Sequence, residues 1–92
     1  DIPSIVEIAK TVRASVIVDA TFTTPVLYRP ADDGVQMVVH SLTKYIAGHG
    51  DVTGGIVATT RMRHEKLANY IKMAGGVLGP FESWLTLRGV KT

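Results

Sequence analysis

The sequence has no cysteine, no long apolar run and no strong excess of either charge. Without cysteine there is neither a disulfide framework nor a thiolate metal site. No apolar run approaches the roughly 18–20 residues that span a bilayer. The formal net charge is +2, and the ten lysines and arginines are scattered rather than gathered in one basic patch. These absences predict no membrane segment and no nucleic-acid partner, and they favour a reducing, cytoplasmic setting.

The composition is that of a globular protein, with 46% hydrophobic and 20% charged residues over 92 positions. Residues 2–14 are predicted to form a helix because apolar residues recur at helical spacing. These residues are Ile2, Ile5, Ile8 and Val12. Residues 15–20 predict a strand whose apolar run does not alternate with polar residues, which is typical of a strand covered on both faces, as in a parallel sheet.

Asp19 and Lys44 are expected to meet at one edge of this sheet. Asp19 closes the first strand, and residues 37–41 predict a second strand that ends just before Lys44. The connection, residues 21–36, is long enough for the crossover that parallel strands require. Ligands of open α/β sheets bind outside the carboxyl ends of the strands.

The rest of the chain supplies few further elements. A glycine-rich loop is followed by a strand and two helices, of which the first is stopped by Gly75-Gly76 and the second by Gly89. The predicted ranges are 48–55 for the loop, 56–60 for the strand, 61–73 for the first helix and 80–88 for the second. We therefore expect residues 1–92 to form a single partial α/β domain without an internal boundary, either as part of a larger domain or in need of partners.

Lys44 is the strongest candidate for chemistry. Ser41 and Thr43 place hydroxyls three and one residues before it. Partial burial of a lysine favours its neutral, nucleophilic amine, which can hold an aldehyde as a Schiff base. Pyridoxal phosphate also requires a carboxylate for its ring nitrogen, which Asp19 can supply, and donors for its phosphate, which Ser41 and Thr43 can supply.

Each of these residues also has an ordinary interpretation. Lys44 can be a solvated surface lysine, Asp19 can cap a turn, and the two hydroxyls can belong to the loop alone. The glycines of residues 48–54 superficially suggest a nucleotide-binding loop, but the Gly-Lys-Ser/Thr ending is missing. His40 and His49 lack partners at zinc spacing, so we interpret both as structural and predict no metal site.

Three segments carry a family resemblance: Ile-Val-Asp-Ala-Thr-Phe-Thr-Thr-Pro at 17–25, Val-Val-His-Ser-Leu-Thr-Lys-Tyr-Ile-Ala-Gly-His-Gly-Asp-Val-Thr-Gly-Gly at 38–55 and Arg-Gly-Val-Lys-Thr at 88–92. Together they resemble the Cys/Met-metabolism, or trans-sulfuration, family of pyridoxal-phosphate enzymes. The resemblance implies a central part of the fold-type I large domain, with a mostly parallel sheet flanked by helices. Ala20 departs from the asparagine that usually follows the aspartate in that family.

The resemblance also implies roles for individual residues. Lys44 would hold the cofactor covalently and act in catalysis, Asp19 would pair with the pyridinium nitrogen, and Ser41 and Thr43 would contact the phosphate. The substrate would be an amino acid such as cystathionine, methionine or O-acylhomoserine, undergoing β- or γ-elimination or γ-replacement, and the enzyme would be a homotetramer. The family's ring-stacking tyrosine and substrate-binding arginine have no counterpart in this sequence. An alternative is therefore a catalytically inert fragment that cannot complete the site alone.

Overall fold

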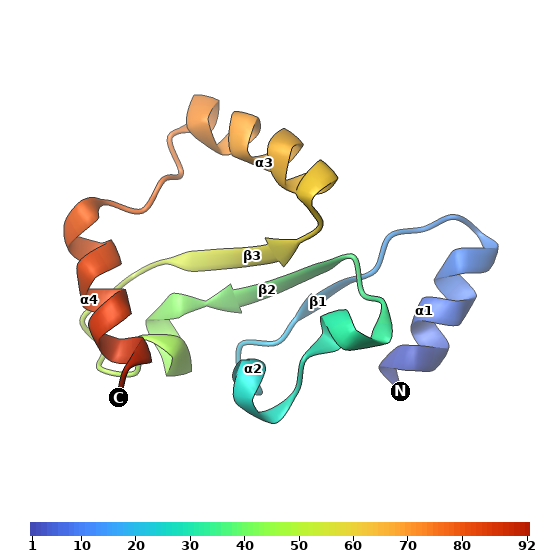
Figure 1. Cartoon of the computed structure of the whole chain (residues 1–92), viewed down its shortest axis with the longest axis horizontal. Helices are drawn as coiled ribbons and strands as arrows, with labels where there is room; N and C mark the ends of the chain where they lie inside the picture. Colours follow the sequence, from blue (N-terminus) through green and yellow to red (C-terminus); the bar gives the residue numbers. More distant parts are fainter.

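The computed structural model describes residues 1–92 as a small three-stranded sheet with helices around it (Figure 1). The chain also has two short helical turns, the 3-10 turn η1 and the π-type turn η2. In chain order the elements are α1 (Ile2–Thr11), β1 (Ile17–Asp19), α2 (Thr24–Leu27), η1 (Pro30–Asp33), β2 (Met37–Ser41), η2 (Leu42–Ile46), β3 (Gly55–Thr59), α3 (Arg61–Ala74) and α4 (Pro80–Val90).

The sheet has the order β1-β2-β3 and is mixed. Strands β1 and β2 are parallel, as predicted, with Asp19 opposite Val39. Strand β3 runs antiparallel to β2, so this chain holds one parallel and one antiparallel pair. The reason lies in residues 42–54, which stay at one edge of the sheet because the Leu42 N–H donates to the Gly54 carbonyl oxygen at 2.9 Å.

Helix α1 is shorter than predicted and buries a different face. It ends at Thr11 rather than at residue 14, and Arg13 has a left-handed backbone (φ 54°) that no helix continues through. Ile5 and Ile8 of the predicted stripe are exposed. Val6 is buried instead, because apolar residues occupy two faces of the helix and only the one with Val6 packs on the sheet. The resulting cluster contains Val6, Ala20, Val35 and Val38.

The C-terminal helices meet one prediction and contradict another. Helix α3 ends at Gly75, whose φ of 80° is the left-handed cap that glycine favours. Gly89, in contrast, does not end α4, which continues to Val90. A Cβ at position 89 would lie 2.1 Å from the Ala47 carbonyl oxygen. Gly89 therefore allows α4 to approach the chain closely after η2, where Ala47, Val52 and Leu85 form a second cluster.

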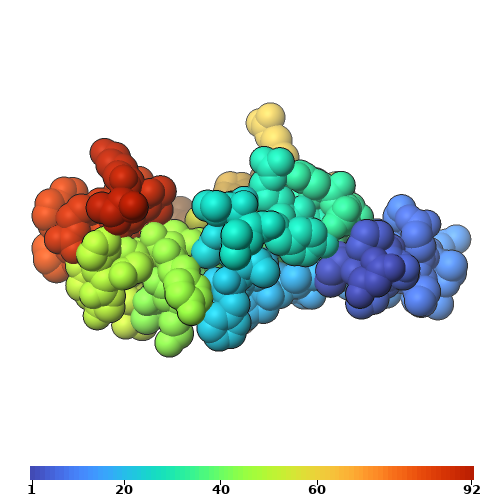
Figure 2. Space-filling model, turned by 90° about the horizontal axis from the view of Figure 1, so that it is seen from below, coloured from blue at the N-terminus to red at the C-terminus, as the bar shows by residue number.

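The molecule is flat and elongated. Its extents are 43 × 32 × 16 Å and its radius of gyration is 14.5 Å, against about 12 Å for a compact chain of this length. Figure 2 shows α1 and α4 at opposite ends of the long axis. Helix α3 arches beside β3 without a buried residue (Figure 1). None of the helices is both long and apolar enough to cross a membrane.

Candidate functional site

The ends of β1 and β2 bring Asp19 and Ser41 to one edge and one face of the sheet. Asp19 pairs with Val39 across the parallel ladder, and Ser41 lies two residues further along β2. Since side chains alternate along a strand, Asp19, Val39 and Ser41 share a face. His40 belongs to the opposite face, where it is buried. The predicted parallel pairing of the two strands, with Asp19 and Ser41 at their joint end, is therefore found.

Thr21 links the two strand ends. Its backbone N–H donates to Oδ1 of Asp19 at 2.9 Å, and its hydroxyl oxygen accepts the Ser41 N–H at 2.8 Å. Its side chain is buried, with 8% exposed. The sequence interpretation did not single out this threonine, although it lies in the segment 17–25 that carries the resemblance.

The same contacts keep Asp19 ionised. Side-chain hydrogen bonding from Thr21 lowers the pKa of Asp19 below its ordinary value, and the bond from the Thr21 backbone lowers it further. Partial desolvation acts in the opposite direction, and the charge of His40 adds a smaller lowering. Hydrogen bonds to a charged carboxylate favour that charged form. Asp19 thus presents a negative charge at the strand end.

The turn η2 carries Thr43 and Lys44 beyond the end of β2. The Ala47 N–H donates to the Leu42 carbonyl at 3.0 Å, a spacing of five residues that defines a π-type turn. Such turns are frequent at functional sites. The Gly54 N–H donates to the Thr43 hydroxyl oxygen at 3.0 Å. The Thr43 hydroxyl proton therefore remains available to a ligand.

Lys44 occupies the predicted position but not the predicted environment. It interrupts the turn with φ −91° and ψ −121°. Its side chain is exposed rather than partly buried. The physical reason is the thinness of the molecule, because nothing in the chain covers the rim of the sheet beyond the end of β2.

The glycine-rich loop after η2 is held by contacts within the chain. Asp51 forms an ion pair with Arg88 of α4, and Nδ1 of His49 lies 2.6 Å from the Ala47 carbonyl oxygen. The loop leads into β3 rather than opening a helix, which speaks against the phosphate loop of a nucleotide-binding module. The Asp51–Arg88 pair was not foreseen from the sequence, although both residues lie in the resembling segments.

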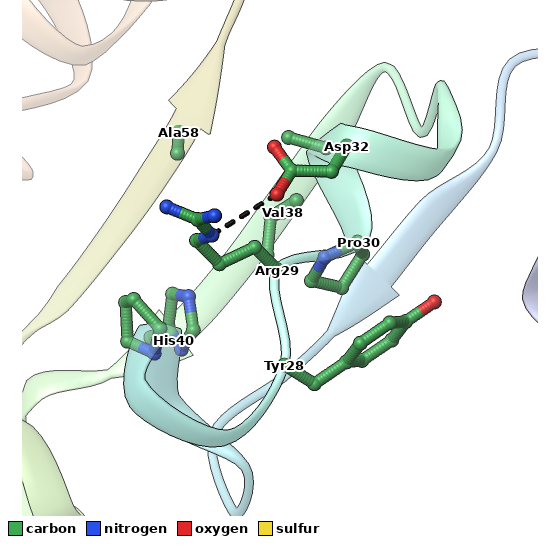
Figure 3. Close-up of a pocket in the computed structure, with 9 residues that line it drawn as sticks. Tyr28, Arg29, Pro30, Asp32, Val38, His40 and Ala58 are labelled. Atoms are coloured by element: carbon green, nitrogen blue, oxygen red, sulfur yellow. Dashed lines mark ion pairs between the residues drawn. The ribbon is translucent and has the colours of Figure 1, made fainter.

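A cavity of 180 Å³ lies on the other face of the sheet (Figure 3). His40, Val38 and Ala58 line it from the strands, and its other wall belongs to the connection before β2. Nδ1 of His40 is buried without a hydrogen-bond partner. Arg29 and Asp32 form an ion pair in the far wall, with 3.0 Å between Nε and Oδ2. Because it occupies the face opposite Asp19, this cavity is separate from the strand-end site.

The strand-end residues fit a cofactor with an aldehyde, a basic ring nitrogen and a phosphate. Lys44 offers a solvent-accessible amine for the aldehyde. Asp19 offers an ionised carboxylate to a protonated ring nitrogen. Ser41 and Thr43 offer hydroxyl protons to phosphate oxygens. The fit rests on the ionised carboxylate and on the free Thr43 proton, both of which follow from the contacts of this structure.

Comparisons with known proteins also indicate a pyridoxal-phosphate enzyme. The profile of the family described as Cys/Met metabolism PLP-dependent enzyme matches residues 1–92. The chain is 50% identical to a cystathionine gamma-synthase from Haemophilus influenzae, covering 100% of this chain and 25% of the relative. It is 44% identical to an L-methionine gamma-lyase from Pseudomonas putida, covering 100% and 24%.

A solved structure shares the fold. The cystathionine gamma synthase from Xanthomonas oryzae pv. oryzae, in complex with cystathionine, superposes with a TM-score of 0.97 at 44% identity, over 100% of this chain and 24% of that one. The chain thus spans about a quarter of the length of the relatives it matches. With the profile matched from end to end, the chain belongs to the Cys/Met metabolism family of PLP-dependent enzymes.

Proposed function

We propose that this chain forms the cofactor-binding part of a pyridoxal-phosphate enzyme of sulfur amino-acid metabolism. The observation that carries the proposal is that Asp19, whose pKa is lowered, and Ser41 end the neighbouring parallel strands β1 and β2, with Thr43 and Lys44 in the turn that directly follows β2. The reaction would be β- or γ-elimination or γ-replacement on cystathionine, methionine or O-acylhomoserine. The names of the relatives include cystathionine, methionine and O-acetylhomoserine, which supports this range of substrates.

Each residue has a distinct task in the proposal. Pyridoxal phosphate, when bound, serves as an electron sink for the substrate carbanion. Asp19 would pair with the ring nitrogen and favour its protonated form. Ser41 and Thr43 would donate hydroxyl protons to the phosphate. Lys44 would hold the cofactor through its aldehyde and would accept the proton from the α-carbon of the substrate.

The assembly is part of the same proposal. Large apolar side chains such as Phe81, Trp84 and Met73 are more than half exposed in this chain. Exposed apolar surface of this extent indicates contact with other protein surfaces. We propose that further parts of the enzyme and other subunits of a homotetramer cover it.

The role of Lys44 is tested by covalent trapping in the intact protein that carries this chain. We expect pyridoxal phosphate followed by borohydride to leave one stoichiometric pyridoxyl group on Lys44, located by peptide mass spectrometry. Lys44→Ala should lose both the adduct and turnover. Lys66→Ala, which removes an exposed lysine of α3, is the matched control and should retain both. Substantial turnover in Lys44→Ala would contradict the assignment.

The isolated 92-residue chain has a second candidate description, as an inert piece unable to complete the site. The exposure of Lys44 favours it, because nothing within this chain encloses that lysine. The same trapping experiment on the isolated chain separates the two descriptions. A specific adduct on Lys44 would indicate a competent partial site, whereas labelling spread over many lysines would indicate the inert piece.

A further inference from the structure

We propose that Gln36 is a positioning residue whose side-chain amide sets the register of β1 against β2. Because Asp19 closes β1, that register decides where Asp19 lies relative to the turn that carries Lys44. The proposal rests on the proposed function above and deepens it. Gln36 acts through the strand that holds Asp19 and does not belong to the candidate cofactor site, since it precedes β2 at the other edge of the sheet.

Gln36 holds the residue that leads into β1. Its Oε1 accepts the Val16 N–H at 2.6 Å. The other end of the same amide, Nε2, donates to the Gly34 carbonyl oxygen at 2.8 Å and so fixes which way the amide points. The Thr59 hydroxyl donates to the Gln36 carbonyl oxygen at 2.7 Å. Gln36 therefore joins the start of β1, the start of β2 and the end of β3.

The apolar side chains of β1 select the buried face of the strand but not its register. Val16, Val18 and Ala20 recur with the two-residue period of a strand, and all three pack in the cluster that contains Val38. A shift of one residue would turn them to the other face and is excluded by burial. A shift of two residues would only replace one small apolar side chain by another beside Val38. A polar contact with a single partner is therefore needed to choose between these registers.

The register matters for the candidate site because β1 is short. It consists of Ile17–Asp19, three residues, so its ladder to β2 contains few hydrogen bonds. A shift of two residues would move Asp19 by about 7 Å relative to Ser41. The Thr21 hydroxyl oxygen, which accepts the Ser41 N–H, holds the register at the site itself, and Gln36 holds it at the far edge. Of these two contacts, the one through Gln36 can be changed without altering the candidate cofactor site.

Three substitutions in the intact protein separate the amide contact from general stability. Gln36→Met has nearly the same length but offers no oxygen to the Val16 N–H. Gln36→Glu keeps an acceptor oxygen for that N–H, and the contact with Gly34 that it loses is exposed, so water can replace it. The control, Thr59→Val, removes a hydrogen bond to Gln36 from the β3 side and leaves the Val16 contact in place.

The measurements are hydrogen exchange in peptides that cover β1, the dissociation constant of pyridoxal phosphate and the visible circular dichroism of the bound cofactor. We expect Gln36→Met to speed exchange in β1 about fivefold, the equivalent of one lost hydrogen bond. Its dissociation constant should rise roughly threefold or more, because part of the population no longer presents Asp19 in register. The dichroic signal per bound cofactor should also change at saturating pyridoxal phosphate. Gln36→Glu and Thr59→Val should keep the dissociation constant within about twofold of the parent and leave the dichroic signal unchanged.

An unchanged dissociation constant in Gln36→Met would overturn the proposal, and so would an equal loss in Gln36→Glu or in Thr59→Val. If Gln36→Met fails to fold, Gln36→Asn takes its place under the same criteria, because its amide is one methylene too short to reach the Val16 N–H.

The exchange measurement separates this proposal from the proposed function, because it does not depend on the cofactor. If the parent protein binds pyridoxal phosphate at Lys44 and Gln36→Met binds it equally well, only the role of Gln36 falls. If the parent protein binds no cofactor at Lys44 while Gln36→Met still loosens β1, the proposed function falls and the positioning role falls with it, although the register contact stands.

Discussion

At the scale of single residues, charge and hydrogen bonding are set by very short stretches of chain. Asp19 is bonded by a residue two positions away, and Tyr28 donates to Asp33 five positions away. Both shifts in ionisation follow from these contacts: the pKa of Asp19 is lowered and the pKa of Tyr28 is raised, chiefly by side-chain hydrogen bonding to Asp33. Local geometry therefore fixes the charge of the proposed site before any larger assembly does.

The raised pKa of Tyr28 predicts a stability difference at high pH. The bond to Asp33 requires the protonated phenol, so its contribution is fully present below the unfolded-state pKa of about 10 and is lost as the pH rises through the higher folded-state pKa. We expect Tyr28→Phe to lower the urea midpoint of the intact protein at pH 7. The difference in urea midpoint between variant and parent should shrink as the pH rises above about 10. Tyr70→Phe, at an exposed tyrosine of α3, is the control. A difference that stays constant with pH would contradict this origin.

At the scale of elements, α4 packs against the loop after η2 and holds it in place. The helix reaches the loop through Gly89 and through the Arg88–Asp51 ion pair. Half of the Arg88 side chain is exposed, so the pair contributes at most about 1 kcal/mol. The close packing at Gly89 is therefore the stronger of the two contacts.

Gly89→Ala tests the close packing of α4 against this loop. The added Cβ would lie 2.1 Å from the Ala47 carbonyl oxygen, and only a backbone shift relieves that overlap. We expect a loss of roughly 3 kcal/mol or more in the free energy of unfolding of the intact protein, measured by urea denaturation. Gly76→Ala is the matched control, because nothing lies within 4 Å of its Cβ position, and its effect should stay within about 1 kcal/mol. Equal effects of the two substitutions would refute the close approach.

At the scale of the whole molecule, the chain has little interior. Only 13 of its 92 residues are buried, and the hydrophobic clusters among them are small, with four buried residues in one and three in the other. A domain of this size already has a narrow margin of stability when it is compact. The flat shape leaves the rim with Lys44 uncovered, so the proposed site depends on surfaces outside this chain.

We expect the isolated 92-residue chain to lack a cooperative unfolding transition. Its small buried area does not offset the conformational entropy of ordering the backbone. Circular dichroism during urea titration should change gradually, and a hydrophobic dye should bind without denaturant, whereas the intact protein should unfold sigmoidally. A sharp transition with a slope of about 1 kcal/mol/M or more would show that the chain folds on its own.

Much of the local structure could be predicted from the sequence. The strands ending at Asp19 and Ser41 follow from short apolar runs closed by polar residues, and the end of α3 at Gly75 follows from the left-handed backbone that glycine permits. The buried face of α1 could not be predicted, because apolar residues lie on two sides of that helix and only packing selects Val6. The continuation of α4 through Gly89 was missed for a similar reason, since this glycine serves a contact and not a helix end.

The sequence by itself determined which chemical groups the site has, since the order of residues places Asp19 and Lys44 at strand ends and Ser41 and Thr43 close to the lysine. The tertiary structure alone decided the antiparallel course of β3, the exposure of Lys44 and the bridge through Thr21. The physical reason is the sequence separation between the residues that decide each feature. Strand ends and helix caps depend on neighbours a few residues apart, whereas burial and the Thr21–Ser41 bond, across twenty positions, exist only once the sheet has formed.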